Sequence, residues 1–226
     1  MKKKFAVDAI INFLLMIFAV VQIFPLYWLF TFSLKDNNEI FGGNIAGLPK
    51  YWRFENYETA FFQADVMKYL LNSVIVTAAT IIITLIVAGA AAYAIERMIW
   101  KAREGVMKFI LLGMMVPLHA ALLPLFIVLS KLHMLNTYWA LIIPYVAFGL
   151  PMAVYLFTSF FASIPKEMEE AAAIDGCNIY QIVGIVIFPL IKPAIATVSI
   201  FTFISAWNEL MFAVPFINSS DYKTLT

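Results

Sequence analysis

The chain has 226 residues, of which 63% are hydrophobic and only 13% are charged, and its formal net charge at pH 7 is +1. Soluble domains carry about 25% charged residues, so this composition excludes an ordinary water-soluble domain and indicates a protein that lies largely in lipid. No stripe of lysine and arginine suggests a nucleic-acid partner. The single cysteine, Cys177, excludes an intrachain disulfide and argues against a thiol metal site.

Five stretches are apolar enough to cross a bilayer as helices, which takes about 20 residues each. The predicted spans are 9–34, 69–95, 109–129, 138–161 and 194–214. The first follows the basic sequence MKKK, but its uncharged run is about twice as long as the apolar core of a signal peptide, and no A-x-A-like cleavage site follows it. We therefore predict a retained helix and an all-α, polytopic bundle of membrane-spanning helices.

Basic residues in the short loops predict the orientation of the chain. They precede the first span and separate the second from the third: Lys2, Lys3, Lys4, Arg97, Lys101, Arg103 and Lys108. Both segments should be cytoplasmic, and the remaining connections then alternate. The predicted cytoplasmic segments are 1–8, 96–108 and 162–193, and the predicted external ones are 35–68, 130–137 and 215–226. Within the first external segment we expect a short amphipathic helix at 56–63.

Polar side chains within the spans are candidates for a transport path. A polar stripe on the second span begins with Asn72 and Ser73, and Asn208 and Glu209 lie late in the fifth. A carboxylate inside a membrane is a functional-site hypothesis by default. Hydrogen bonding between helices explains the stripe equally well, and an interfacial, structural role would explain Glu209. These four residues are the candidates for contact with a substrate.

The cytoplasmic segment 162–193 contains the sequence EEAAAIDG, a cluster of acidic residues in a chain with few charges. The stretch consists of strong helix formers, and Gly176 is a natural left-handed residue after a helix. Asn178 and Gln181 then resemble a capping box. The sequence therefore predicts two short helices joined by a tight turn, the second ending at Pro189. Taken alone, the segment could be a solvated loop or a docking surface.

The stretch IPKEMEEAAAIDGCNIYQIVGIVIFPLIKPAI resembles the EAA loop of permeases from importer-type ABC transporters. That pattern is E-A-A, three residues, G, nine residues, an aliphatic residue, one residue, then an apolar residue and proline. The residues at these positions are, in order, Glu170, Ala171, Ala172, Gly176, Val186, Phe188 and Pro189. Only Val186 and Phe188 depart slightly from the usual residue types, so the loop is similar to the family's pattern throughout.

The wider chain is similar to the carbohydrate-uptake, MalG-like branch of this family. The similar stretches are FENYETAF, KYLLNSVIV, GAAAYAIER, LPLFIVL, FGLPMAVYL and SAWNEL. The resemblance implies a type I ABC importer permease for a sugar or oligosaccharide, in a bacterial or archaeal cytoplasmic membrane with the N-terminus inside. Such permeases have six spans, so a sixth is expected and is absent from this chain, which ends at YKTLT.

The resemblance also implies a set of partners. These are a second, MalF-like permease, two ATP-binding subunits, an external solute-binding protein, a sugar substrate and membrane lipid. The EAA loop would couple to an ATP-binding subunit, with Glu170 as the charge contact. The implied coupling residues are Glu170, Ala171, Ala172, Asp175, Gly176, Val186 and Pro189. The implied contacts with the solute-binding protein are Asn218, Ser219, Ser220, Asp221 and Tyr222.

No cofactor, catalytic or metal site is expected on this chain. It has no G-x-x-x-x-G-K-[ST] phosphate loop, so ATP and Mg²⁺ are expected on the partner ATPase. Import of a glycerol phosphate or polyol by the same architecture is one alternative. An ion-coupled secondary transporter is another, but it would need ionisable relays in mid-span, where only Glu209 is available. A membrane enzyme is disfavoured because no nucleophile or paired carboxylates occur at membrane depth.

Overall fold

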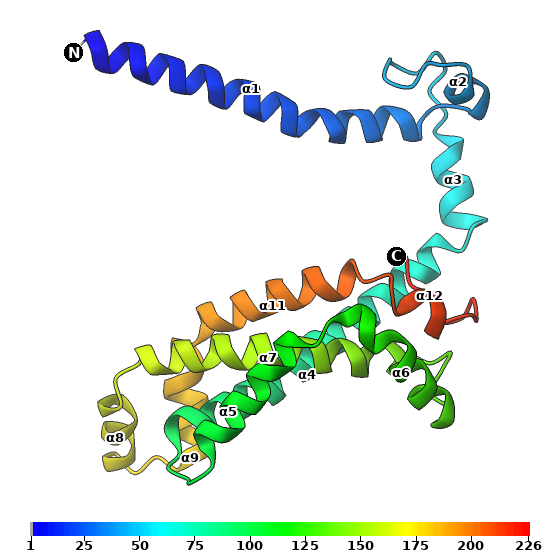
Figure 1. Cartoon of the computed structure of the whole chain (residues 1–226). Helices are drawn as coiled ribbons and strands as arrows, with labels where there is room; N and C mark the ends of the chain where they lie inside the picture. The colour runs from blue at the N-terminus through cyan, green and yellow to red at the C-terminus, as the bar shows by residue number, and fades with distance from the viewer. Residues whose placement is uncertain (1) are drawn as a thin grey trace. The chain divides into compact units, whose positions relative to one another are not determined.

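The computed structural model describes residues 2–226, and this range contains helices and connecting turns but no strand (Figure 1). Met1, the first residue of the predicted cytoplasmic segment 1–8, lies outside the described residues. The chain divides into two units, Met1–Val66 and Met67–Thr226. The predicted all-α class is confirmed.

The first unit consists of a long apolar helix followed by a small polar module. Its helices are α1 (Lys2–Ser33), α2 (Asn37–Phe41) and α3 (Glu55–Phe62). The most apolar window of α1, within residues 10–33, has a mean hydropathy of 2.2, and none of it is buried within this chain, as expected for a helix solvated by lipid. α3 confirms that a short helix forms at the predicted position 56–63.

Polar contacts hold the module together after α1. The Lys35 side chain is buried, and its ammonium donates hydrogen bonds to the backbone oxygens of Asn44 (2.6 Å) and Ile45 (3.2 Å). Asp36 and Arg53 form an ion pair with 3.1 Å between their charged groups. A buried ammonium must be hydrogen-bonded, so these contacts fix the chain reversal that follows α1.

The second unit is a helical bundle whose two ends differ. Its elements are α4 (Val66–Arg97), α5 (Arg103–Leu112), η1 (Gly113–Met115), α6 (Leu118–Lys131), α7 (Trp139–Ser163), α8 (Glu167–Ile174), α9 (Ile179–Gln181), η2 (Ile182–Ile187), α10 (Phe188–Leu190), α11 (Lys192–Trp207) and α12 (Ala213–Phe216). Figure 1 shows α8 and α9 together at one end and α6 and α12 together at the other. We call these the α8 end and the α12 end.

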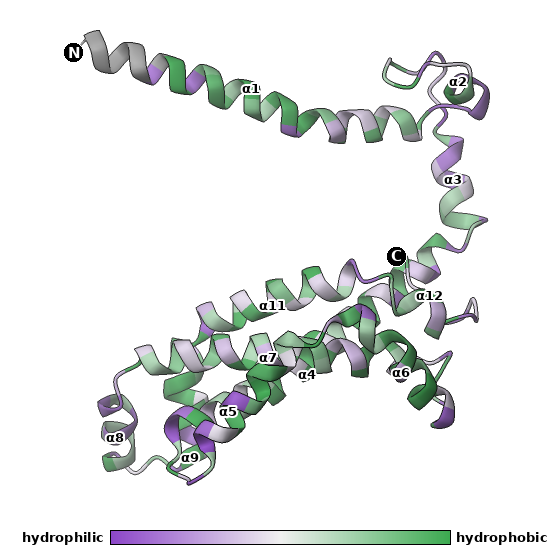
Figure 2. Ribbon diagram, in the orientation of Figure 1, coloured by the Kyte–Doolittle hydropathy of each residue, from purple (hydrophilic) through white to green (hydrophobic). Residues whose placement is uncertain are grey.

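Three helices are long and apolar enough to cross a membrane on their own, and two bent helix pairs bring the number to five. The single helices are α1, α4 and α7. Continuous helices suit these segments because a helix satisfies its own backbone hydrogen bonds where no water is available. Hydrophilic residues, purple in Figure 2, gather on α8 and around α9, beyond the apolar parts of the bundle.

The predicted span 109–129 is not one continuous helix. η1 ends at Met115, α6 begins at Leu118, and the chain bends by 99° between them. Val116 and Pro117 have extended backbone, with ψ of 114° and 126°. A proline disfavours helical geometry in the residue before it and lacks an amide N–H, so the helix breaks at this point.

The predicted span 194–214 is helical only as far as Trp207. The side-chain amide of Asn208 donates back to the carbonyl of Ile204 at 2.8 Å, which closes the last turn of α11. The Glu209 carboxylate then accepts the backbone N–H of Phe212 at 3.0 Å, and a new helical turn follows. Both contacts are local side-chain caps that compete with continued helix, so the span ends earlier than hydropathy alone indicates.

Buried apolar residues form one cluster toward each end of the second unit. The cluster at the α8 end includes Ala88, Ala92, Phe157, Phe161, Ala172, Ile182, Ile187 and Ala194. The cluster at the α12 end includes Val76, Leu129, Leu141, Phe212 and Phe216. Ala88 and Ala92 are completely buried, and such small residues let membrane helices approach closely. α8, although polar, is therefore packed onto the bundle through part of its surface.

Candidate functional site

A hairpin of two short helices forms the α8 end of the bundle. Gly176 follows α8 with a φ of +88°, and its N–H donates to the carbonyl of Ala173 at 3.1 Å. This left-handed conformation is readily adopted only by glycine. Asn178 then accepts a hydrogen bond from the N–H of Gln181 (3.0 Å), and its own N–H donates to the Gln181 side chain (2.8 Å). The predicted glycine turn and capping box are confirmed.

The second helix of the hairpin is longer and less regular than the prediction. It passes through the π-helical stretch η2 and ends at Leu190, one residue beyond the predicted end at Pro189. Val186 is half-buried against the core cluster, whereas Pro189 is exposed. π-helical turns are rare, and η2 (Ile182–Ile187) is what makes the second helix of the hairpin irregular.

The two faces of α8 have different environments. Ala172 is only 7% exposed, and it belongs to the core cluster of this chain. Glu170, Ala171, Asp175 and Gly176 are exposed. Of the two alanines next to Glu170, only Ala171 therefore presents its methyl group to the outside.

Two large apolar side chains on the hairpin were missed by the sequence analysis. Ile174 and Tyr180 are each 86% exposed, one on either side of the Gly176 turn. The signal for them was present, because apolar residues in a loop predicted to be cytoplasmic need either a core or a partner to cover them. The tip of the hairpin thus combines the charge of Glu170 and Asp175 with exposed apolar area.

A buried ion pair attaches α8 to the bundle. Arg97, the last residue of α4, places its Nε 2.9 Å from Oε1 of Glu169, with side-chain exposures of 4% and 16%. Nη2 of Arg97 also donates to the backbone oxygens of Phe161 (2.9 Å) and Ile164 (2.8 Å). The Tyr93 hydroxyl donates to Oε2 of Glu169 at 3.1 Å. In the sequence, Arg97 was used only to predict membrane orientation; its spacing from Tyr93, which places both on one helix face, was the available signal for this contact.

The substrate-path candidates on α4 hold the end of the chain. The side-chain amide of Asn72 donates to the backbone oxygens of Asp221 (3.0 Å) and Lys223 (2.8 Å). The hydroxyl of Ser73 accepts the backbone N–H of Leu225 at 2.8 Å. Both side chains are buried. In this structure they fasten residues 221–225 to the bundle.

The candidate contacts with a solute-binding protein lie on that fastened segment. Oδ1 of Asn136 accepts the backbone N–H groups of Asn218 (2.6 Å) and Ser219 (2.9 Å). Asn136 itself has a φ of +59°, a conformation that asparagine tolerates better than most residues. The side chains of Asn218 and Ser220 are exposed. The segment is therefore held by its backbone at Asn218 and Ser219 and exposes the side chains of Asn218 and Ser220.

Asp221 and Tyr222 complete the attachment of this segment. Asp221 forms an ion pair with Lys68, with 2.6 Å between Oδ1 and Nζ, and remains exposed. The ring of Tyr222 packs edge-on against Tyr138 at 5.0 Å between centroids. The Tyr138 hydroxyl donates to Oδ1 of Asn72 at 2.8 Å, which joins the aromatic contact to the amide contact.

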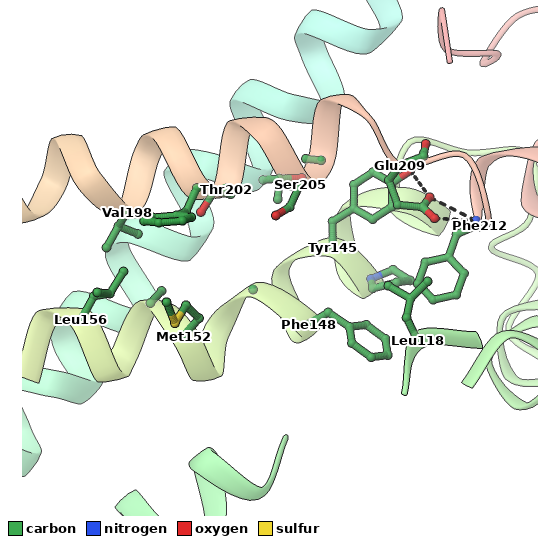
Figure 3. Close-up of a pocket in the computed structure, with 16 residues that line it drawn as sticks. Leu118, Tyr145, Phe148, Met152, Leu156, Val198, Thr202, Ser205, Glu209 and Phe212 are labelled. Carbon is green, nitrogen blue, oxygen red and sulfur yellow. Dashed lines mark hydrogen bonds between the residues drawn. The ribbon is translucent and has the colours of Figure 1, made fainter. Parts of the chain in front are cut away.

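Glu209, one of the four substrate-path candidates, lines a cavity (Figure 3). The cavity has a volume of about 310 Å³ and is mostly apolar. One carboxylate oxygen of Glu209 accepts the Tyr145 hydroxyl at 2.8 Å, and both oxygens lie 3.0–3.1 Å from the N–H of Phe212. Thr80, Thr202 and Ser205 add hydroxyl groups to the lining. Asn208, in contrast, is exposed and bonded back to its own helix.

Among the described residues, no group of three or more His, Cys, Asp or Glu side chains could hold a metal ion. The polar residues described above form helix caps, ion pairs and attachments to backbone atoms. Beside them, the molecule has an exposed hairpin tip and a mostly apolar cavity. Such an arrangement can bind a partner and hold segments in position.

Comparison with known proteins places these features in a family context. Residues 89–225 match the profile described as "Binding-protein-dependent transport system inner membrane component". The chain is 36% identical over 218 residues to the diacetylchitobiose uptake system permease protein NgcG of Streptomyces coelicolor, covering 96% of this chain and 72% of that protein. It is 34% identical over 212 residues to the trehalose/maltose transport system permease protein MalG of Thermococcus litoralis, covering 92% and 74%.

A solved structure has the same fold. The crystal structure of a bacterial ABC transporter involved in the import of the acidic polysaccharide alginate superimposes with a TM-score of 0.82 at 25% sequence identity. The match covers 97% of this chain and 78% of that one. The arrangement of helices described above is therefore shared with a permease of an ABC importer.

Proposed function

The chain belongs to the family of inner membrane components of binding-protein-dependent transport systems, and we propose that it is the permease subunit of an ATP-driven importer for a sugar or oligosaccharide. It is a multi-pass membrane protein with the all-α fold of type I ABC importer permeases, and its similarity to carbohydrate-uptake permeases is in accord with the predicted branch of the family. The proposal goes beyond family and fold in three respects: coupling to an ATPase, the partner subunits and the substrate.

The observation that carries the coupling proposal is the exposed tip of the hairpin. Glu170 and Asp175 supply charge there, and Ile174 and Tyr180 expose apolar area on either side of the turn. Protein interfaces combine a desolvated apolar centre with charges that select the partner. The hairpin therefore docks on an ATP-binding subunit, with Glu170 paired to a basic side chain of that subunit. ATP and Mg²⁺ bind to the partner.

We place the remaining partners by the proposed orientation of the bundle in the membrane. With the N-terminus inside, the α8 end faces the cytoplasm and the α12 end faces outward. The exposed side chains of Asn218, Ser220 and Asp221 are then available to an external solute-binding protein. A second permease completes the translocation path, and two ATP-binding subunits serve the pair.

The substrate class rests on the relatives and on the cavity. Two of the relatives belong to uptake systems for diacetylchitobiose and for trehalose or maltose, and the solved transporter is involved in the import of alginate. Carboxylate and hydroxyl groups beside aromatic rings are the groups that bind a sugar, and Glu209, Ser205 and Tyr145 supply them at the cavity. We propose that Glu209 contacts the passing sugar.

Substitution of Glu209 by glutamine tests this contact. The glutamine side-chain oxygen can still accept hydrogen bonds from the Tyr145 hydroxyl and from the N–H of Phe212. The free energy of unfolding should therefore change little, by about 1 kcal/mol. Loss of the charge should raise the solute concentration needed for half-maximal uptake about tenfold, since a charged hydrogen bond contributes about 1.5–3 kcal/mol. Unchanged uptake would remove Glu209 from the path.

The proposed function as a whole is tested by reconstitution. The chain would be purified with its second permease and ATP-binding subunits, inserted into liposomes, and supplied with binding protein and radiolabelled oligosaccharides. We expect uptake that requires both ATP and the binding protein. Uptake that proceeds on an ion gradient without ATP would instead indicate an ion-coupled transporter.

A further inference from the structure

We infer that Arg97 is a positioning residue that ties the hairpin to α4 and α7 at once, so that a displacement of α8 is passed to both membrane helices. The inference rests on the proposed function, because it assumes that an ATP-binding subunit moves α8. It goes further by naming the side chains through which that movement reaches the bundle.

The geometry places three elements on one guanidinium. Arg97 is the last residue of α4, and its Nε faces the carboxylate of Glu169 on α8 at 2.9 Å. Its Nη2 donates to the carbonyl oxygens of Phe161, near the end of α7, and Ile164, just after it. Tyr93, one turn earlier on α4, donates its hydroxyl to the other oxygen of Glu169. Among the side chains that the structure describes, no other one forms an ion pair with α8.

The chemistry of these contacts favours arginine at this position. A guanidinium presents several N–H donors in a fixed plane, so it can serve a carboxylate and two carbonyls at the same time. The carbonyls at the end of α7 also carry the negative end of the helix dipole, which a cation stabilises. A lysine ammonium is a point charge and lacks this fork, so it could not reproduce the three-way contact.

The other attachments of the hairpin are of a different kind. Ala172, Ile182 and Ile187 pack into the core cluster, and apolar packing is non-directional. Packed surfaces of this kind can slide by small amounts, whereas hydrogen bonds are directional. The directional bonds here run from Nη2 of Arg97 to the two carbonyls at the end of α7 and from the Tyr93 hydroxyl to Glu169. Nε of Arg97 and Oε1 of Glu169 add an ion pair without a hydrogen bond between these two atoms. Glu169 is also the immediate neighbour of Glu170, the proposed charge contact with the ATP-binding subunit. A displacement of Glu170 therefore moves its chain neighbour Glu169, which is paired directly with Arg97.

The test uses the complete transporter reconstituted in proteoliposomes, with solute uptake and ATP hydrolysis measured in the same vesicles. The variants are Glu169→Ala and Arg97→Ala, and Glu167→Ala is the matched control because Glu167 is an exposed carboxylate on the same helix. We expect solute taken up per ATP hydrolysed to fall about tenfold in both variants, within the range of measured coupling energies. The control should keep the wild-type ratio.

A purely structural role would give a different result. It would lower the amount of assembled transporter, and with it both rates in proportion, so an unchanged ratio in assembled Glu169→Ala and Arg97→Ala complexes overturns the inference. If the alanine variants do not assemble, Glu169→Gln and Tyr93→Phe remove less and should lower the ratio about fivefold. A wild-type ratio in these milder variants, or their failure to assemble, also overturns it. Wild-type uptake without ATP would contradict the proposed function instead.

Discussion

The α8 end and the α12 end of the bundle each hold a polar segment in place, but they do so with different chemistry. At the α8 end, the polar attachment is charged and converges on one side chain, Arg97. At the α12 end, residues 217–225 are held mainly by uncharged groups on three different side chains, Asn72, Ser73 and Asn136. Most of those bonds go to backbone atoms.

The two ends differ in what is lost when one attaching side chain is removed. Several separate neutral hydrogen bonds each contribute about 0.5–1.5 kcal/mol, so the loss of one leaves the others in place. Removal of a single buried guanidinium removes the whole charged attachment at once, because it leaves a buried carboxylate without a partner charge. An attachment through one charged side chain suits an element that moves as a unit. Several separate neutral hydrogen bonds suit a surface that stays in place.

The largest effect should come from Arg97→Met at the α8 end. Removal of one partner from a buried ion pair costs about 3–5 kcal/mol of unfolding free energy, because Glu169 is left buried and charged. The double variant Arg97→Met/Glu169→Met should recover part of this loss, since both charges are then gone. Denaturant or thermal unfolding in detergent measures both. A double variant less stable than the single one would contradict the pairing.

Charge reversal at Glu170 should come next, and it acts on binding. Because the side chain is exposed, Glu170→Lys should leave the stability of this chain nearly unchanged while weakening association with the ATP-binding subunit by about 2–5 kcal/mol. The matched control is Glu167→Lys, on the same helix. Co-purification and ATP-dependent uptake measure the effect, and equal behaviour of the two variants would remove Glu170 from the interface.

At the α12 end, Asn72→Leu should have a smaller effect that stays local. It removes the donors to the backbone oxygens of Asp221 and Lys223, and the loss of these two hydrogen bonds costs about 1–3 kcal/mol. Hydrogen exchange of residues 217–225 should speed up, while exchange in α8 should not change. Thr84→Val on the same helix is the control, because the buried Thr84 hydroxyl has no hydrogen-bond partner among the described residues. Faster exchange at both ends would contradict their independence.

The smallest effect should come from Gly176→Ala in the hairpin. Nothing lies within 4 Å of the added methyl group, so only the φ of +88° is strained, at about 1–2 kcal/mol. Gly184→Ala in the same hairpin also meets nothing within 4 Å, and no left-handed φ occurs there, so this control should be neutral or slightly stabilising. Thermal unfolding distinguishes the two, and equal shifts would contradict the conformational explanation.

Local sequence features predicted the local structure well. The capping box of Asn178 and Gln181 and the left-handed turn at Gly176 both formed as expected, because each depends on residues within a few positions of one another. The short helix predicted at 56–63 formed, as α3 (Glu55–Phe62), for the same reason. The break at Val116 and Pro117 was less evident, since a proline in a long apolar stretch can either kink a helix or end it.

Side-chain partners were predicted poorly wherever they are distant in the sequence. Asn72 was a candidate for the transport path, but its partners lie about 150 residues away at the end of the chain. Glu169 stood out in the sequence only as a member of the acidic cluster EEAAAIDG, whereas its partner is at the end of α4. A single sequence contains no information on which of many compatible polar groups meet.

By itself, the sequence determined that this is an all-α membrane protein with an EAA-type hairpin, because hydropathy, capping residues and motif spacing act along the chain. Only the tertiary structure decided which face of the hairpin is available, since the burial of Ala172 and the exposure of Ile174 depend on how α8 packs against the bundle. It likewise decided that Arg97, at the end of α4, forms the ion pair that attaches the hairpin to the bundle alongside the apolar packing of Ala172. Both outcomes follow from close approach between elements that are remote in the chain.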